Sequence, residues 1–244
     1  MITPQRLRYR LAITSEVLRA PRVELCLSNT TAARRRHAEL TARHPTLHVV
    51  SRGGFGAALM PLPDSMDDYL KSRTRMRRNR RKAIAAGFEF TAFHGPEHVD
   101  DMLAIHRSAP VRQGQPMHGA YLDEATVEGY AARARTLSGI VDRTGVVRAY
   151  AHTEIQGELG SFQRLIGHAD SLDDGVVYLL TSEVIRLFID ARQATGLPRW
   201  VMCGVLWGNS SGLAYFKRRA GFKPYRASFT LEEPTPVDPP EPRG

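Results

Sequence analysis

Residues 139–169 read GIVDRTGVVRAYAHTEIQGELGSFQRLIGHA. Three apolar runs in this stretch are separated by turn signals at Thr144–Gly145 and around Gly157, which predicts an antiparallel meander of three strands. Directly afterwards, residues 176–196 carry apolar side chains at every third or fourth position. That period predicts a long amphipathic helix, and Gly196 provides its stop signal.

The same patterns predict the elements on either side of this meander. Strands are expected at residues 22–28, 46–61, 88–93, 199–207 and 227–231, and helices at residues 30–44, 65–87, 97–106, 123–137 and 209–220. Their order predicts an α/β fold with a mixed, mostly antiparallel sheet flanked by helices. We expect an N-terminal α/β subdomain at residues 1–64, a main domain at 65–232 and a disordered proline-rich tail at 233–244.

Charge and composition narrow the possible partners of the chain. Its 244 residues include 34 Lys and Arg against 25 Asp and Glu, a net charge of +9 that favours polyanionic partners such as RNA. Cys26 and Cys203 lie far apart and form neither a disulfide framework nor a CxxC pair, which predicts a reducing, cytoplasmic location. The nine histidines form no HExxH motif, so we expect no metal. Neither a signal peptide nor a membrane span is predicted, and the oligomeric state stays open.

The arginine-rich segment 65–87 is predicted to form one helix from the cap residue Ser65 to Gly87. Its stripe of positions 69, 73, 76, 80, 83 and 87 is apolar except for Arg73 and Arg80, so these two arginines are expected to face the protein body. A buried arginine needs an anionic partner, which could be a structural carboxylate or a substrate phosphate. Arg77 borders the stripe and is a third candidate for substrate binding.

Three stretches resemble one branch of the GNAT acyltransferase superfamily, the Fem-type aminoacyltransferases and their BioF2-like relatives. They are RTRMRRNRRKAIAAGFEF, MLAIHRSAPVRQGQPM and YFKRRAGF, at residues 73–90, 102–117 and 215–222. The resemblance spans about residues 65–232 and implies a GNAT-like sheet, with residues 1–64 as a shortened remnant of the first half of Fem proteins. It implies transfer of an acyl group to an amine on a small molecule or peptide, without a covalent enzyme intermediate.

The resemblance also implies the catalytic group. Common acetyl-CoA GNATs place a tyrosine four residues before the Gly-Phe pair, where this chain has Lys217. The Fem pattern has Phe-Lys, two residues, an aromatic residue and Gly; FKRRAG matches it except at Ala220. In Fem-type enzymes this lysine is thought to stabilise the transferred carbonyl, so Lys217 is the leading catalytic candidate. Tyr215 is a second catalytic candidate, as the shifted acid of an acetyl-CoA-type enzyme. It lies about 200° away around the helix, so under the Fem pattern it is expected to be a neighbour or a core residue.

Four further residues are assigned to the site with weaker support. His168 ends the strand that lines the substrate site in GNATs and is a candidate base. Trp207 and Asn209 come just before the last helix, and Arg112 lies in the second resembling stretch; all three are candidates for substrate binding. For Trp207 packing in the core is the competing interpretation.

The donor is predicted from the segment HADSLDDGVVYLL, residues 168–180. Acyl-CoA-dependent GNATs carry a glycine-rich pyrophosphate loop here, whereas this chain keeps only Gly175 and adds three aspartates, of which Asp173 or Asp174 could cap the helix. Fem-type enzymes lack this loop and take the aminoacyl group from charged tRNA, so the resemblance implies aminoacyl-tRNA as donor. Acyl-CoA stays the alternative, and no tightly bound cofactor is expected. A non-catalytic RNA- or nucleotide-binding protein on the same scaffold is the second alternative.

Overall fold

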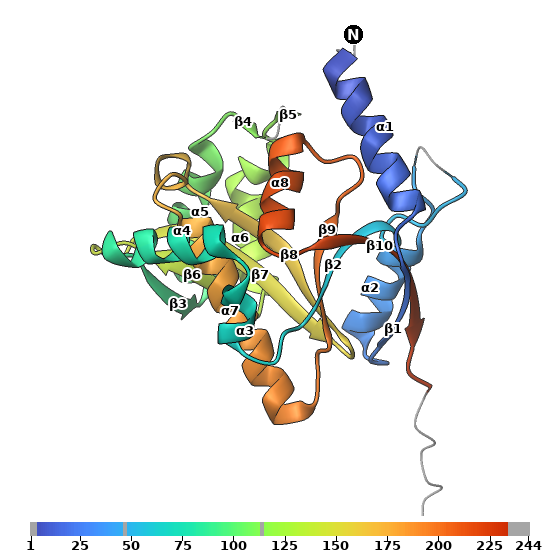
Figure 1. The fold of residues 1–244 in the computed structure, drawn as a ribbon. Helices are drawn as coiled ribbons and strands as arrows, with labels where there is room; N and C mark the ends of the chain where they lie inside the picture. Colours follow the sequence, from blue (N-terminus) through green and yellow to red (C-terminus); the bar gives the residue numbers. More distant parts are fainter. Residues whose placement is uncertain (1–3, 46–47, 113–114, 234–244) are drawn as a thin grey trace, which may run out of the picture.

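An eight-stranded sheet organises the computed structural model, which describes residues 4–45, 48–112 and 115–233. Its strands are β1 Arg22–Leu27, β2 Phe55–Pro61, β3 Glu89–Phe93, β6 Leu137–Val141, β7 Val147–Gln156, β8 Leu159–Gly167, β9 Trp200–Val205 and β10 Lys223–Leu231, while β4 Val111–Arg112 and β5 Gln115–Pro116 form a separate hairpin. The order across the sheet is β1-β10-β2-β9-β8-β7-β6-β3, so β1 and β3 are its edges (Figure 1).

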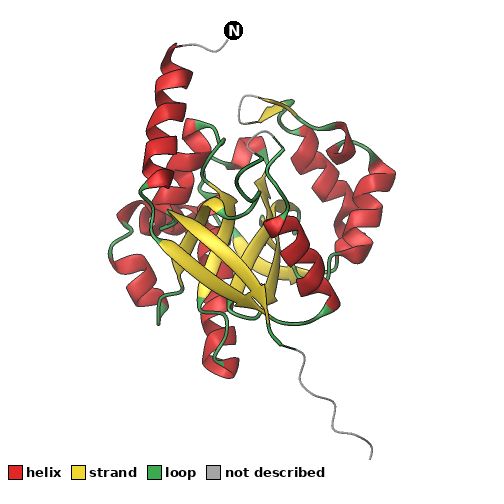
Figure 2. Ribbon diagram, turned by 90° about the vertical axis from the view of Figure 1, so that its right-hand side faces the viewer, coloured by secondary structure: helices red, strands yellow, loops and turns green. Residues whose placement is uncertain are grey.

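The helices cover both faces of this sheet (Figure 2). They are α1 Pro4–Leu18, α2 Thr31–Thr41, α3 Met66–Lys71, α4 Thr74–Ala85, α5 Val99–Arg107, α6 Glu124–Arg133, α7 Val176–Thr195 and α8 Ser211–Arg219, with 3₁₀ turns η1 Gly95–His98, η2 Gly119–Tyr121 and η3 Ala169–Ser171. Helices α4, α7 and α8 share one apolar core with one face of the sheet. On the other face, α2 covers β1, β2 and β10, while α5 and α6 cover β6 and β7.

The predicted fold class is confirmed, including the antiparallel meander of β6, β7 and β8. Only two neighbouring pairs, β1 with β10 and β8 with β9, run parallel. Burial drives this arrangement, because the strands alternate apolar side chains between two covered faces. Among the described helices, none combines the length and hydrophobicity that crossing a bilayer requires.

The strands of residues 1–64 belong to the same sheet as the rest of the chain. β2 lies between β9 and β10, and β1 pairs with β10 along its whole length. The boundary expected at residue 64 therefore does not coincide with a break in the sheet. Of the tail expected to be disordered, residues 234–244 lie outside the described part of the chain.

Several predicted element bounds were wrong. The strand expected from residue 46 begins only at Phe55, after turns through Gly53 and Gly54, and residues 46–47 are not described. The helix expected to reach residue 137 ends at Arg133, because Leu137 opens β6. Helix α1 had not been predicted at all, although Tyr9, Ile13 and Val17 recur at every fourth position and the last two are buried.

The arginine-rich segment forms two helices where one was predicted. Helix α3 ends at Lys71, and Arg73 takes φ −111° and ψ 64°, which interrupts the helix before α4. The predicted cap is confirmed, since the Ser65 hydroxyl accepts from the Asp68 N–H. The buried stripe is confirmed at Tyr69, Met76 and Ala83. Gly87 ends the segment with φ +87°, a conformation that favours glycine.

Candidate active site

The parallel strands β8 and β9 separate in the middle of the sheet. They pair only from Leu159 to Ser161 on β8 and from Trp200 to Met202 on β9. Beyond this point β8 continues to Gly167 and β9 to Val205 without pairing to each other. In open α/β sheets, ligands bind beside the carboxyl ends of the strands, where neighbouring strands separate. A ligand site is therefore expected at the unpaired ends of β8 and β9.

Lys217 lies against the unpaired end of β9. Helix α8, capped by the Ser210 hydroxyl one residue later than expected, carries Lys217 on its inner side, and the residue is only 5% exposed. Its Nζ donates to the Val205 carbonyl oxygen at 2.8 Å. Within the described residues no carboxylate lies within ion-pair distance, and burial lowers the pKa of Lys217. A buried lysine without a counter-ion is costly, which marks it as a functional candidate.

Asn209 shares the acceptor that Lys217 uses. Its Nδ2 also donates to the Val205 carbonyl oxygen, so two residues predicted from sequence meet at one backbone atom. The β9 backbone bulges here, with Val205 opposite Ala57 and Met202 opposite Leu59 on β2. Gly204 makes the bend with φ +61°, a region that side-chain-bearing residues rarely adopt. Bulges of this kind re-aim backbone groups beside active sites.

Tyr215 faces away from Lys217, as the helical spacing predicted. It is 42% exposed, and its hydroxyl accepts from the Arg75 guanidinium at 3.1 Å. Hydrogen bonding to Arg219, together with the charge of Arg75, lowers the pKa of Tyr215. The side chain therefore belongs to the outer surface of α8 and its predicted catalytic role gains no support from this position.

His168 and Arg112 are engaged in local structure near the end of β8. The His168 ring accepts from the Asp170 N–H at 3.4 Å and caps η3. The Arg112 guanidinium donates to the carbonyl oxygens of Gly167 and Ile105 at 3.0 and 2.7 Å and to the Ser108 hydroxyl. Arg112 thus ties the end of β8 to α5. A role of either residue in substrate contact stays a prediction.

Trp207 packs against the N-terminal part of the chain. Its indole Nε1 donates to the Thr14 hydroxyl at 3.0 Å, and its ring meets His44 and Phe55 edge to face. These contacts match the core interpretation that the sequence left open.

The two inward arginines of the stripe have different partners. Arg80 donates from Nε and Nη2 to one Glu183 oxygen at 3.2 and 2.7 Å, so its anion is a structural carboxylate. Arg73 donates to the Tyr69 carbonyl oxygen, lies 4.6 Å from the Tyr69 ring and has no ion pair within the described residues. Arg77 lines a surface pocket between α3 and α4, and Asp67 and Asp68 line the same pocket.

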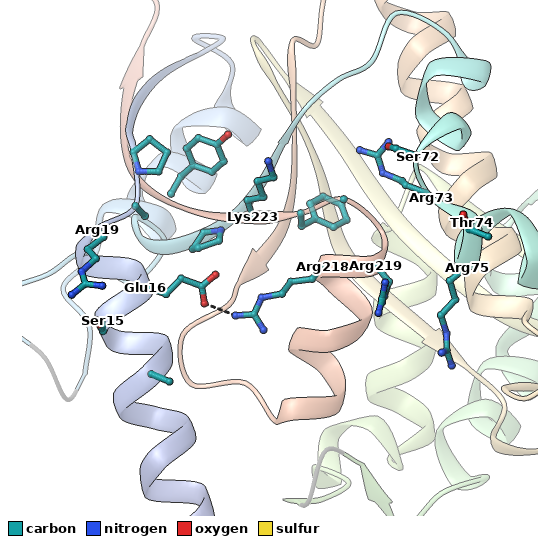
Figure 3. A pocket seen from close by; sticks show the side chains of 17 residues that line it. Ser15, Glu16, Arg19, Ser72, Arg73, Thr74, Arg75, Arg218, Arg219 and Lys223 are labelled. Carbon is teal, nitrogen blue, oxygen red and sulfur yellow. Dashed lines mark hydrogen bonds and ion pairs between the residues drawn. The ribbon is translucent and has the colours of Figure 1, made fainter.

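Arg73 opens onto a large basic pocket of about 1140 Å³ between α1, α4, the end of α8 and the start of β10. The charged residues that line this basic pocket are Arg19, Arg73, Arg75, Arg218, Arg219, Lys223 and a single carboxylate, Glu16. Figure 3 shows that these cations come from separate elements around the pocket, with Glu16 paired to Arg218. Sequence reasoning missed most of this group, although the run of cations after Phe216 was a usable signal.

The start of α7 is the helix N-terminus at which a pyrophosphate loop was sought in the sequence. Here α4 and its side chains contact the turn before the helix. Gly175 caps α7 with φ +87°, so neither Asp173 nor Asp174 caps it as expected. A Cβ on Gly175 would lie 2.6 Å from the Asn79 carbonyl oxygen, so α4 packs directly on this turn. Lys82 of α4 binds the Asp173 carbonyl oxygen and pairs with Asp174 at 3.4 Å.

The described residues contain no group of three or more His, Cys, Asp or Glu side chains placed to hold a metal ion. Cys203 lies buried near Lys217, and burial raises the pKa of its thiol. The polar side chains that meet beside the unpaired end of β9 are Lys217 and Asn209, at the Val205 carbonyl oxygen.

No protein-family model matches the sequence, and no curated protein sequence matches it. Among solved structures, FemX matches 70% of this chain and 59% of its own length, with a TM-score of 0.54 and 11% identity. The C-terminal domain (DUF2156) of a putative lysylphosphatidylglycerol synthetase from Agrobacterium fabrum matches 69% of this chain and 57% of its own, with a TM-score of 0.44 and 14% identity. A Trypanosoma brucei acetyltransferase matches 62% of this chain and 99% of its own, with a TM-score of 0.38 and 16% identity.

The similarity to FemX establishes a shared fold. This chain has a GNAT/Fem-like fold, as the order of its elements predicted. The chain spans somewhat more than half of the length of FemX and of the Agrobacterium domain.

Proposed function

We propose that this chain, which has the fold of FemX, is an N-acyltransferase that forms an amide by transferring an aminoacyl group from charged tRNA to an amine. The observation that carries the proposal is Lys217, a buried lysine without a counter-ion beside the unpaired ends of β8 and β9. Its position four residues before Gly221 and directly after Phe216 matches the Fem pattern noted in the sequence. Asn209 supports the same site through the shared Val205 carbonyl.

The reaction follows from the charge at this site. The neutral amine of the acceptor attacks the carbonyl carbon of the aminoacyl ester, and a C–N bond forms while negative charge develops on the carbonyl oxygen. Among the described residues the Val205 carbonyl oxygen is the one acceptor of Lys217 Nζ, which leaves two of its three hydrogens to stabilise this oxyanion. The ester C–O bond then breaks, the ribose oxygen leaves as a hydroxyl group, and the nitrogen loses its extra proton.

The basic pocket favours a polyanionic donor. Six cations against one carboxylate create a field suited to the phosphates of an RNA strand. Helix α8 joins this pocket to the proposed site, because it carries Lys217 inward and Arg218 and Arg219 outward into the pocket. The contact of α4 with the Gly175 turn and the acidic residues there further disfavour a bound pyrophosphate at the start of α7.

A tRNA-binding experiment tests this assignment of the basic pocket. Fluorescence anisotropy with bulk uncharged tRNA should give an affinity that falls steeply between 50 and 200 mM salt, as counterion release requires at roughly this range. Arg75→Gln should reduce the slope of log K against log salt by about 1. Arg135→Gln, an exposed arginine on the opposite side of the sheet, is the matched control and should leave the slope unchanged.

Mass spectrometry of the reaction products tests the activity itself. The full chain is incubated with an amine pool and either charged tRNA or acetyl-CoA, and new amides are identified. Aminoacyl amides formed from charged tRNA support the proposal. N-acetylated amines formed from acetyl-CoA would instead support the alternative acyl-CoA-dependent activity. Tight tRNA binding without any product would favour a non-catalytic RNA-binding protein.

A further inference from the structure

A second, smaller pocket of about 260 Å³ opens on the sheet face opposite α8. We call it the polar pocket; the lining residues that concern us are Arg35, Tyr121, Tyr130, His152, Glu154 and Arg164. Arg36 and Glu39 also line it and pair with each other at 3.1 Å. The lining residues come from α2, from the region of η2 and α6, and from the central strands β7 and β8. None of these residues belongs to the site described around Lys217.

Arg164 presents a fixed cation to the polar pocket. Its guanidinium lies between two aromatic rings, 3.7 Å from the centre of Tyr130 and 4.4 Å from that of Tyr121. It also donates to the Tyr150 hydroxyl at 3.1 Å. Within the described residues it has no carboxylate at ion-pair distance. Stacking on two rings holds the guanidinium rigidly, so it is organised in advance to bind an anion.

Glu154 presents a carboxylate to the same pocket. One oxygen accepts from the side-chain amides of Gln156 and Gln163 at 2.8 and 3.1 Å, which hold the group in place. The nearest cationic candidate is His152, whose Nε2 lies 3.8 Å from the other oxygen. Burial, assisted by Arg164 and Arg35, lowers the pKa of His152, so its imidazole is neutral near pH 7. Within the described residues this 3.8 Å contact is the only ion-pair candidate that Glu154 has.

The polar pocket lies at the level of the sheet where β8 and β9 separate. Arg164 is three residues beyond Ser161, the last β8 residue paired with β9, and Val205 is three residues beyond its partner Met202. Between Ser161 and Arg164, β8 carries a bulge that places Arg164 opposite His152 on β7. Thus Lys217 reaches this level from one face of the sheet, and Arg164 lines a pocket at the same level on the other.

We propose that the polar pocket binds the acceptor substrate and that this acceptor is a compact zwitterion. Its amine would lie against Glu154 and its carboxylate or phosphate against Arg164. Two opposite charges that line one pocket without pairing to each other are both satisfied by such a molecule. This inference rests on the proposed transferase activity. The bound ammonium passes one proton to the Glu154 carboxylate, and the resulting neutral amine attacks the donor carbonyl.

Binding measurements on the full chain without donor test the inference apart from the transfer reaction. Thermal shift assays first survey the proteinogenic L-amino acids and O-phosphoethanolamine, which separates a carboxylate from a phosphate as the anionic group. Calorimetry then compares the strongest binder with its N-acetylated form, which lacks the ammonium group. It also compares the binder with a form that lacks the anionic group, which is the amide of an amino acid or, for phosphoethanolamine, ethanolamine. Each modification removes one of the two charged groups and should weaken binding by about tenfold or more.

Substitutions in the pocket provide the second arm of the test. Glu154→Gln keeps the shape and should weaken binding by about tenfold or more, and Arg164→Gln should do the same. Glu128→Gln and Arg135→Gln remove the same charges from exposed positions that do not line the pocket and should leave binding unchanged. If Arg164→Gln does not fold, Glu154→Gln and the modified ligands still test whether the pocket binds a zwitterion. The inference is overturned if no compound in the survey binds, or if removing either charged group from the ligand leaves the affinity unchanged. Binding without transfer would refute the proposed activity alone.

Discussion

Lys217→Met keeps the length of the side chain and removes its charge. In the structure Lys217 is 5% exposed, and within the described part of the chain one of its three donor hydrogens has a protein acceptor, the Val205 carbonyl oxygen. The substitution therefore removes at least one charge-assisted hydrogen bond to the developing oxyanion from a buried site. Losing one such donor costs about 100- to 1000-fold in turnover, or about 2.7–4 kcal/mol. Substrate binding should change much less, because the interaction strengthens only as charge develops.

Single-turnover kinetics with charged tRNA and saturating acceptor measures this loss directly. Lys71→Met is the matched control, since Lys71 is exposed on α3. Full activity in a folded Lys217→Met protein would refute the catalytic role and leave α8 as a short basic helix. Loss of tRNA affinity in place of turnover would equally refute it, because Lys217 points away from the basic pocket.

Thermal stability provides an independent check on the burial of Lys217. Burial lowers the pKa of Lys217 below its ordinary value of 10.5, so the unfolded chain binds this proton more tightly than the folded chain does. Wild-type stability should therefore rise as pH increases from the lowered pKa toward 10.5. Lys217→Met lacks this dependence, so its melting temperature relative to wild type should be highest near pH 7 and decline at alkaline pH. Parallel pH profiles of the two proteins would contradict this reasoning.

Three further predictions follow from contacts away from Lys217. Tyr215→Phe should change turnover less than about threefold, since Tyr215 is 42% exposed and faces away from the unpaired strand ends; steady-state kinetics measures this, and a crippling loss would favour an acid role for Tyr215. Arg80→Met should lower the free energy of unfolding in urea by about 1–2 kcal/mol, because Glu183 loses one of its two arginine partners. The exposed Arg78→Met is the control, and an equal loss of stability in both variants would contradict the pairing of Arg80 with Glu183. His106 is fully buried and burial lowers its pKa to about 4, so it contributes on the order of 3 kcal/mol of stability above pH 6.5, which is lost as the pH falls toward 4. His106→Gln should flatten this part of the plot of unfolding free energy against pH, and an unchanged plot would refute the reasoning.

Local patterns in the sequence were sufficient for most of the fold. Turn signals at Thr144–Gly145 and Gly157 separated the meander strands, and the apolar period of residues 176–196 predicted α7. These features depend on neighbours within a few positions, which a sequence records directly. The break at Arg73 was not predicted because both halves of the segment follow the helical period. Only the packing of α3 and α4 against α7 and β2 shows that the chain bends there.

The sequence by itself also determined that Lys217 and Tyr215 lie on different faces of the helix, because its register separates them by about 200°. It could not decide which arginine meets which anion. Arg80 and Glu183 are 103 positions apart, and their pairing depends on how α4 packs on α7. The polar pocket was beyond local reasoning for the same reason: Glu154 and Arg164 lie on neighbouring strands, while the rings around Arg164 come from Tyr121 and Tyr130 on another layer. Only tertiary structure brings these groups together, since long-range packing of the sheet and helices, and not any local pattern, sets the distances between them.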